Sequence, residues 1–177
     1  LCSRVVLRKF SHAARKKLEP RQVGVGTRCG GEAAVRAGVA YLELHPDHVL
    51  INTDLAAAFQ NMSRVAIFQE LLGDPSLRGL IPYLRLLYIT PANLYVAIPD
   101  SPTEPAIITS KSGAQQGCTF GTLLWSLGWH KALIKAAAVA NGLTVSVVDD
   151  GLYGCPAGTA ARLLRRIPPR RCGSRGW

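Results

Sequence analysis

Apolar and polar positions along the chain change between helical and strand periodicity several times within 177 residues. The predicted helices cover residues up to about 18, 32–44, 64–72, a segment from 74 onward and about 119–140. The predicted strands cover 49–51, 93–98, 106–113 and 145–148, and a further strand is expected after the last of these. Because close strand pairs interrupt the helices irregularly, this order predicts an α/β protein of the α+β type. We expect an antiparallel sheet with helices packed on one face, and not a doubly wound parallel sheet.

Capping and turn residues set several of the expected boundaries. Ser63 is a suitable N-cap for the helix that follows it, and Gly73 is the natural end of that helix. The next helix is expected to begin directly afterwards with Pro75 at its first position, where no N–H is left unpaired. Pro99 and Pro102 place a loop between the two middle strands.

Two adjacent aspartates end the last predicted strand. Asp149 and Asp150 are followed at once by Gly151. Asp-Gly between apolar runs is a strong hairpin signal, because glycine accepts the positive φ of tight turns. We therefore expect both carboxylates at the tip of a hairpin. A solvated turn without chemical function is the alternative interpretation.

A further aspartate, Asp54, follows the predicted strand over 49–51. If the two acid-ending strands are neighbours in one sheet, the carboxylates of Asp54, Asp149 and Asp150 meet at one edge. Clustered carboxylates repel unless cations neutralise them. Two Mg²⁺ ions about 3.5–4 Å apart would do so and would serve in-line phosphoryl transfer. Two unrelated turns remain the alternative.

Two more features are candidates for a nucleotide pocket. Phe59 stands five residues after Asp54, where an aromatic ring could press on the sugar of a nucleotide and exclude a 2′-hydroxyl. An ordinary core aromatic is the alternative for this residue. Gly113 and Gly117 flank Gln116 in a loop before the long predicted helix. Glycine permits close backbone approach, so this loop can lie against a base pair or a template backbone.

Basic residues gather at the two ends of the chain. The net charge is +10, and residues 1–36 and 162–177 hold fifteen of the 21 Lys and Arg residues. Residues 37–161 have six Lys and Arg against nine Asp and Glu. Basic flanks around an acidic centre suggest a polyanion held near a carboxylate site. Basic ends that are only solvated are the alternative.

The cysteines and the hydropathy bound the cellular setting. Five cysteines with no close pair argue against a disulfide framework, so we expect a reducing, intracellular compartment and no disulfide-linked partner. No apolar run is long enough to span a bilayer and no signal peptide is recognisable. A membrane partner is therefore not expected.

Four segments carry a resemblance to a known family. "TDLAAAFQNMSR", "SKSGAQQGCTFGTLLWSL" and "VVDDGLYG", in this order and at these separations, resemble motifs A, B and C of reverse transcriptases. The likeness is greatest to the non-long-terminal-repeat (non-LTR) retroelement type. "PRQVGVGTRCGGEAAVRAG" is similar to the segment that precedes the first aspartate in those enzymes. The resemblance runs from about residue 7 to residue 164 and indicates a truncated fragment of such a domain.

The resemblance implies a role for each matching residue. It implies catalysis by Asp54, Asp149 and Asp150, metal binding by Asp54, Asp149 and the backbone of Leu55, and nucleotide or template contact by Ala56, Phe59, Gln116 and Gly117. The sequence departs from the usual pattern at Ala57 (often Asn), Gly121-Thr122 (usually Ser-Pro) and Val147 (usually aromatic). None of these departures removes an implied metal ligand.

The resemblance also implies a fold and an activity. The fold is a polymerase palm with partial fingers over 1–164, with the thumb absent and a basic tail over 165–177 outside the fold. The activity is RNA-directed DNA polymerisation in the nucleus, which needs an RNA template, a DNA primer, dNTP and two Mg²⁺ ions, for which Mn²⁺ can substitute. The alternative is a degenerate, catalytically inactive retroelement remnant that only binds nucleic acid through its basic ends.

Overall fold

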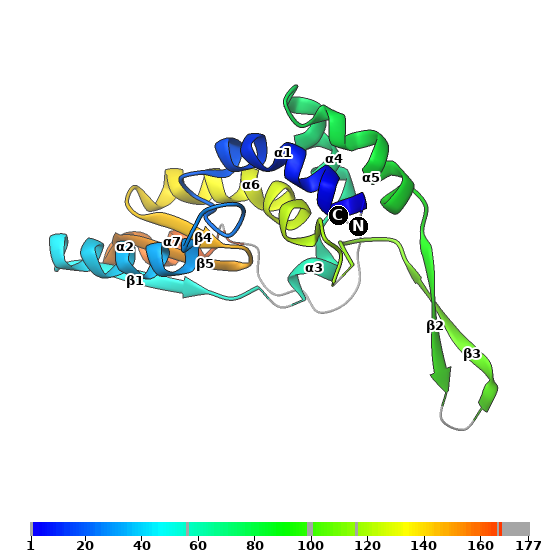
Figure 1. Ribbon diagram of the computed structural model, residues 1–177. Coiled ribbons are helices and arrows are strands. Elements are labelled where there is room, and N and C mark those ends of the chain that lie inside the picture. The colour runs from blue at the N-terminus through cyan, green and yellow to red at the C-terminus, as the bar shows by residue number, and fades with distance from the viewer. Residues whose placement is uncertain (1, 56, 99–100, 116, 166, 168–177) are drawn as a thin grey trace.

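The fold is seen in a computed structural model that describes residues 2–55, 57–98, 101–115, 117–165 and 167 (Figure 1). In chain order the elements are α1 (Cys2–Leu18), α2 (Gly30–Leu44), β1 (His48–Thr53), α3 (Ala58–Asn61), α4 (Arg64–Gly73), the 3₁₀ helix η1 (Arg78–Leu80), α5 (Ile81–Tyr88), β2 (Ala92–Ile98), β3 (Ser101–Ser110), α6 (Gly121–Ala140), β4 (Thr144–Val147), β5 (Asp150–Pro156) and α7 (Ala157–Leu164).

The main sheet has three antiparallel strands in the order β1-β5-β4. β1 lies beside β5 with Thr53 opposite Gly151, and β4 lies on the other side of β5 with Val147 opposite Asp150. The antiparallel α+β class expected from the sequence is confirmed. Since β5 is the central strand, it joins the two strands that were expected to end in acids.

Helices cover both faces of this sheet. On one face, Tyr153 and Cys155 of β5 are fully buried in the main core, to which α6 and α7 contribute. On the other face, a Cβ at Gly38 of α2 would lie 2.8 Å from Cδ2 of Leu152 and 3.1 Å from Cδ2 of Leu50. Successive residues of a strand point to opposite faces, and β5 is apolar on both. Helices α6 and α7 therefore cover one face of the sheet, as expected. Helix α2 covers the opposite face, which the sequence did not predict.

Helix α6 runs through the centre of the fold (Figure 1). It packs against α1, α4, α7 and the sheet, and ten of its 20 residues are buried. A helix enclosed on so many sides needs apolar residues around most of its circumference. Its end is the expected one, because Asn141 takes up the left-handed conformation with φ at 49°.

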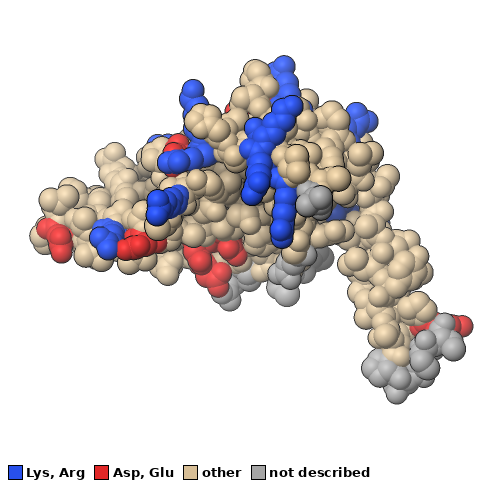
Figure 2. All heavy atoms as spheres, in the orientation of Figure 1, with Lys and Arg blue, Asp and Glu red and all other residues tan. Residues whose placement is uncertain are grey.

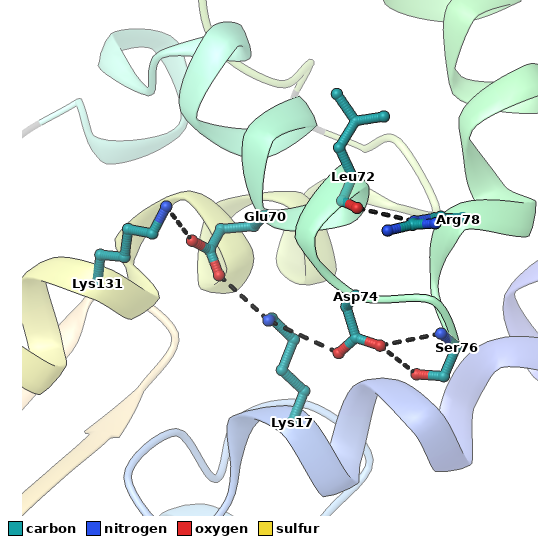
Figure 3. Close-up of polar contacts among 7 residues, drawn as sticks. All are labelled: Lys17, Glu70, Leu72, Asp74, Ser76, Arg78 and Lys131. Carbon is teal, nitrogen blue, oxygen red and sulfur yellow. Dashed lines mark hydrogen bonds and ion pairs between the residues drawn. The ribbon is translucent and has the colours of Figure 1, made fainter.

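A buried acid joins three helices, as Figure 3 shows. Glu70 of α4 forms ion pairs with Lys17 of α1 at 3.2 Å and with Lys131 of α6 at 2.9 Å, and Lys17 also reaches Asp74 at 3.6 Å. Burial by itself raises the pKa of Glu70, but hydrogen bonds from Lys131 and Lys17 outweigh it and bring the pKa below its ordinary value. The charged carboxylate therefore holds α1 and α6 against α4.

The expected start of α4 is confirmed and that of the next helix is wrong. The Ser63 hydroxyl accepts the N–H of Ala66 at 3.3 Å and caps α4. After α4, the Asp74 carboxylate accepts the backbone N–H and the hydroxyl of Ser76 at 3.0 and 2.6 Å. These bonds hold a turn, because a short acidic side chain competes with helix formation when it bonds its own backbone two residues on. Helix α5 begins only at Ile81.

Strands β2 and β3 form a separate antiparallel hairpin that projects from the helical body (Figure 1). β3 begins at Ser101, so Pro102 lies within a strand and not in the expected loop, whereas Pro99 lies outside the described residues. An edge strand tolerates proline, because an N–H that faces away from the ladder needs no strand partner. Apolar side chains of the hairpin are exposed, with Tyr95 67% and Ile107 58% accessible.

The packed core continues beyond the domain end expected at residue 164. Ile167 is buried in the main core, and its N–H donates to the carbonyl of Leu163 at 3.1 Å. Residues 168–177 of the expected basic tail lie outside the described residues.

The described ranges also bear on membrane and redox chemistry. In them, no helix combines the length and the hydropathy that a bilayer crossing requires. The cysteines at positions 2, 29, 118 and 155 are free thiols there.

Candidate active site

The strand register brings the acid-ending strands to one edge of the sheet. β1 ends at Thr53, which faces Gly151 near the start of β5. Because the two strands are antiparallel, Asp54 continues toward the edge at which β5 begins with Asp150. Asp54 and Asp150 are exposed, and Asp149 is half-buried. The two strands that were expected to be neighbours, β1 and β4, share the sheet but do not pair, because β5 lies between them.

The hairpin between β4 and β5 carries two of the acids. Val147 pairs with Asp150, so Val148 and Asp149 form a two-residue turn. The backbone of Val148 is left-handed, with φ at 58°. The predicted hairpin is confirmed, but the prediction of an Asp-Gly turn is wrong, because Asp150 and Gly151 already belong to β5. The positive φ of this turn is therefore taken up by a valine and not by the glycine.

Gly151 is needed for close packing and not for the turn. A Cβ at this position would lie 2.7 Å from the Tyr153 ring and 2.8 Å from Oγ1 of Thr53. Any larger residue would thus push on β1 and on the core at the edge that carries the acids.

A glutamine from the N-terminal region holds the turn. Gln22 is fully buried, and its Oε1 accepts the N–H of Val148 at 2.7 Å. Its Nε2 donates to the carbonyl of the same Val148 at 2.9 Å. Sequence reasoning gave Gln22 no role. The only available signal was a polar amide among the apolar residues and glycines of the "QVGVG" segment.

The loop before α6 is fixed against the segment that follows β1. The N–H of Gly113 donates to the Met62 carbonyl and that of Ala114 to the Phe59 carbonyl, both at 2.8 Å. Gly113 has φ at 72°, and a Cβ there would overlap the Phe59 carbonyl oxygen. Nε of Arg64 donates to the Gly113 carbonyl at 3.0 Å. Only glycine fits this close approach, so the segments that resemble motifs A and B are bonded to each other.

Phe59 lies against the first turns of α6. Its ring centroid is 6.1 Å from that of Trp125, and a Cβ at Gly121 would lie 3.5 Å from the Phe59 ring. The side chain is half-buried, so part of the ring packs in the core and part is accessible. Contact of this ring with a nucleotide sugar stays a prediction.

Of the remaining residues expected at the site, the structure describes Leu55 and Gly117. Leu55 is half-buried and packs against the main core. Gly117 is exposed and left-handed, with φ at 82° and open space where a Cβ would lie. Ala56 and Gln116 lie outside the described residues.

The acids suit a magnesium ion by their chemistry. Mg²⁺ is commonly held by one or two carboxylates together with substrate phosphate oxygens. Asp54 and Asp149 supply such hard oxygen donors at neighbouring strand ends. Within the described ranges, no group of three or more His, Cys, Asp or Glu side chains is arranged to hold a metal ion. The metal roles of Asp54, Asp149 and Leu55 therefore stay predictions.

Solved telomerase structures resemble this fold. Apo telomerase from Candida tropicalis, truncated from its C-terminal domain, matches with a TM-score of 0.61 at 15% identity, over 93% of this chain and 36% of that chain. Telomerase from Candida albicans, in complex with the TWJ fragment of telomeric RNA, matches with a TM-score of 0.48 at 9% identity, over 92% of this chain and 30% of that chain. This chain spans about a third of the length of the first of these structures.

Sequence comparison adds no relative. No protein family matches the sequence as a whole or in part, and no curated protein does. A match at 15% identity establishes the fold alone. The chain has a polymerase-palm-like fold of mixed α+β class, which it shares with telomerase, a reverse-transcriptase-related enzyme.

Proposed function

We propose that this chain is the palm, with part of the fingers, of a non-LTR retroelement reverse transcriptase. Its parent enzyme would transfer nucleotides from dNTP to a primer 3′-hydroxyl on an RNA template. The observation that carries the proposal is the β1-β5-β4 register, which sets Asp54 at the same end of the sheet as Asp149 in the turn and Asp150 at the start of β5. The telomerase-like fold supports it independently of the sequence motifs.

The chemistry would depend on position and charge. Asp54, Asp149 and the Leu55 backbone would hold two Mg²⁺ ions, or Mn²⁺ in their place, which when bound neutralise the phosphates and activate the primer hydroxyl. Asp150 would add negative charge at the same edge. Phe59 would limit the space beside the nucleotide sugar. Such a site works by orientation and charge neutralisation and forms no covalent intermediate with the protein.

The charge distribution supports a nucleic-acid partner. Figure 2 shows Lys and Arg side chains gathered over α1. Arg4, Arg8 and Lys16 of this helix are exposed. The opposite side of α1 packs into the core through residues such as Ala14 and Leu18, both fully buried. The basic side of α1 is thus held rigidly toward solvent, where it would attract the phosphates of an RNA template and a DNA primer. Nuclear localisation follows from this proposed function.

A second candidate is a catalytically inactive remnant that only binds nucleic acid. The basic surface of α1 favours it, because phosphate binding there requires none of the carboxylates. Binding that weakens with salt is common to both candidates. Only metal-dependent nucleotide incorporation separates them.

Primer extension on an RNA template annealed to a DNA primer tests the proposal, first with Mg²⁺ and then with Mn²⁺. Asp149→Ala is the paired control. Extension by the wild-type chain that is lost in Asp149→Ala would establish the polymerase function. Salt-sensitive template binding without extension under either metal would support the inactive remnant instead.

A further inference from the structure

The turn between β4 and β5 contains a backbone conformation that its residue disfavours. Val148 has φ at 58°, in the left-handed region, where a β-branched side chain is a genuine outlier. Such conformations persist only where surrounding contacts determine them. The neighbouring turn residue is Asp149, one of the proposed metal ligands. The contacts that hold Val148 therefore also determine where the Asp149 carboxylate lies.

Gln22 supplies those contacts from a distant part of the chain. Its side-chain amide pairs with both polar backbone atoms of Val148, at 2.7 Å to the N–H and 2.9 Å to the carbonyl oxygen. The same amide also accepts the N–H of Gly24 at 3.0 Å and donates to the Ser146 hydroxyl at 3.3 Å. An amide side chain offers two donors and a carbonyl oxygen with two lone pairs, so all four positions are used.

Gln22 is itself fixed in place. Its N–H donates to the carbonyl of Leu18 at the end of α1, at 3.0 Å. On either side of it, the N–H of Val23 donates to the Ser146 carbonyl at 2.9 Å, and the N–H of Ser146 donates to the Arg21 carbonyl at 2.6 Å. These bonds form a parallel bridge between Gln22 and Ser146 beside β4. The amide cannot shift without breaking this bridge.

The loop after Gln22 also touches the turn directly. A Cβ at Gly24 would lie 2.7 Å from both Cγ2 and the backbone nitrogen of Val148. Only a residue without a side chain leaves room for Val148 in its observed conformation. Two positions of one segment thus contact the same turn residue. Gln22 forms hydrogen bonds with Val148, and Gly24 leaves the space that Val148 occupies.

We infer that Gln22 is a positioning residue for Asp149: its amide holds Val148 left-handed and so orients the neighbouring Asp149 carboxylate for metal binding. The inference rests on the proposed function for the role of the acids. Ser146 reinforces the same arrangement, because its hydroxyl lies 2.9 Å from the carbonyl oxygens of both Val148 and Asp150. Gln22 touches no substrate in this scheme and acts only through the turn.

The test compares Gln22→Met with a matched core variant in the full chain. Methionine keeps the length of the side chain and removes all of its hydrogen bonds. Leu80→Ala leaves a cavity in η1, which packs against α4 and α5, and should lower Tm without reaching the turn. The readouts are hydrogen exchange of the Val148 amide, Mn²⁺ affinity of the free chain by electron paramagnetic resonance, and kcat and KM for primer extension.

Gln22→Met should speed exchange of the Val148 amide and weaken Mn²⁺ binding by roughly tenfold or more, as expected when a residue that orients a metal ligand is lost. It should lower kcat with little change in the KM for dNTP. Leu80→Ala should leave Mn²⁺ affinity unchanged. It should speed exchange of the Val148 amide by no more than its lower global stability accounts for. Gly24→Ala is a second, independent perturbation and should shift the same readouts in the same direction.

Two outcomes would overturn different parts of the inference. If Gln22→Met and Gly24→Ala alter Val148 exchange and Mn²⁺ affinity no more than Leu80→Ala does, Gln22 has a purely structural role. If the wild-type chain binds no Mn²⁺ and extends no primer, the proposed function fails and the positioning role fails with it. The exchange rate of Val148 in that case still reports whether the contact itself exists, so the two failures are distinguishable.

Discussion

Thr53 and Gly151 face each other at the last pair of the β1–β5 ladder, and the Thr53 hydroxyl donates to the Gly151 carbonyl at 3.3 Å. Beyond this pair the two strands continue into Asp54 and Asp150. The pair therefore fixes how the end of β1, which leads to Asp54, lies beside the start of β5, which carries Asp150. Because side chains alternate between faces, a slip of one residue here would turn Asp54 to the opposite face of the sheet.

Gly151→Ala should destabilise the fold, because its Cβ would lie 2.7 Å from the Tyr153 ring in a closely packed core. Overpacking of this kind costs about 1–3 kcal/mol in the free energy of unfolding, measurable by urea denaturation. Gly158→Ala is the matched control, since no atom outside its chain neighbours and the backbone of its own helix lies within 4 Å of a Cβ there, and the position is in the first turn of α7. Alanine should stabilise that helix by roughly 0.5–1 kcal/mol. Equal effects of the two variants would contradict close packing of Gly151 against Tyr153.

Asp54→Asn should abolish primer extension without unfolding the chain. The side chain is exposed, so the free energy of unfolding should change by less than about 0.5 kcal/mol. Loss of a charge that stabilises the transition state should lower the extension rate by roughly a hundredfold or more. Asp47→Asn, an exposed aspartate just before the other end of β1, is the control and should leave the rate unchanged. A similar loss in both variants would argue against a specific role for Asp54.

Glu70→Gln should destabilise the junction of α1, α4 and α6. The substitution leaves Lys17 and Lys131 without their shared carboxylate. Removing one partner of a buried ion pair costs several kcal/mol, and partial exposure of Lys131 reduces this to about 1–3 kcal/mol. Thermal unfolding at neutral pH measures the effect.

The pH dependence of stability gives a second check on the same cluster. The folded state lowers the pKa of Glu70 below its unfolded value of 4.5, so the carboxylate stabilises the fold above that pH. This contribution is lost as the pH falls from about 4.5 through the folded-state pKa. Between these values the wild-type chain should lose stability more steeply than Glu70→Gln. Parallel curves for the two proteins would show that folding does not lower the pKa of Glu70.

The basic side of α1 should provide much of the affinity for nucleic acid. We expect a triple variant to bind an RNA–DNA duplex at least about tenfold more weakly and to reduce the slope of log K against log salt by roughly 2–3. The substitutions are Arg4→Gln, Arg8→Gln and Lys16→Gln. The control removes the same charge from three exposed positions on other segments: Arg36→Gln, Lys111→Gln and Arg162→Gln. Fluorescence anisotropy at several salt concentrations checks both. Equal losses would mean that only total charge matters.

Local sequence signals predicted the elements whose ends depend on short-range bonds. Ser63 caps α4 through a hydroxyl that reaches an N–H three residues away, and Asn141 ends α6 by its own left-handed conformation. The same kind of signal failed at Asp74, where two bonds to Ser76 form a turn in place of a helix start. Competing local bonds of similar strength cannot be ranked from residue types alone.

By itself the sequence determined the acids, their place after β-branched strands, and the approximate limits of most helices. It did so because strand preference and helix capping depend on neighbours within a few residues. The tertiary structure alone decided that β5 lies between β1 and β4, and that the positive φ falls on Val148 and not on Gly151. The physical reason is long-range: the amide that holds Val148 belongs to Gln22, 126 positions earlier, and no local pattern encodes that contact.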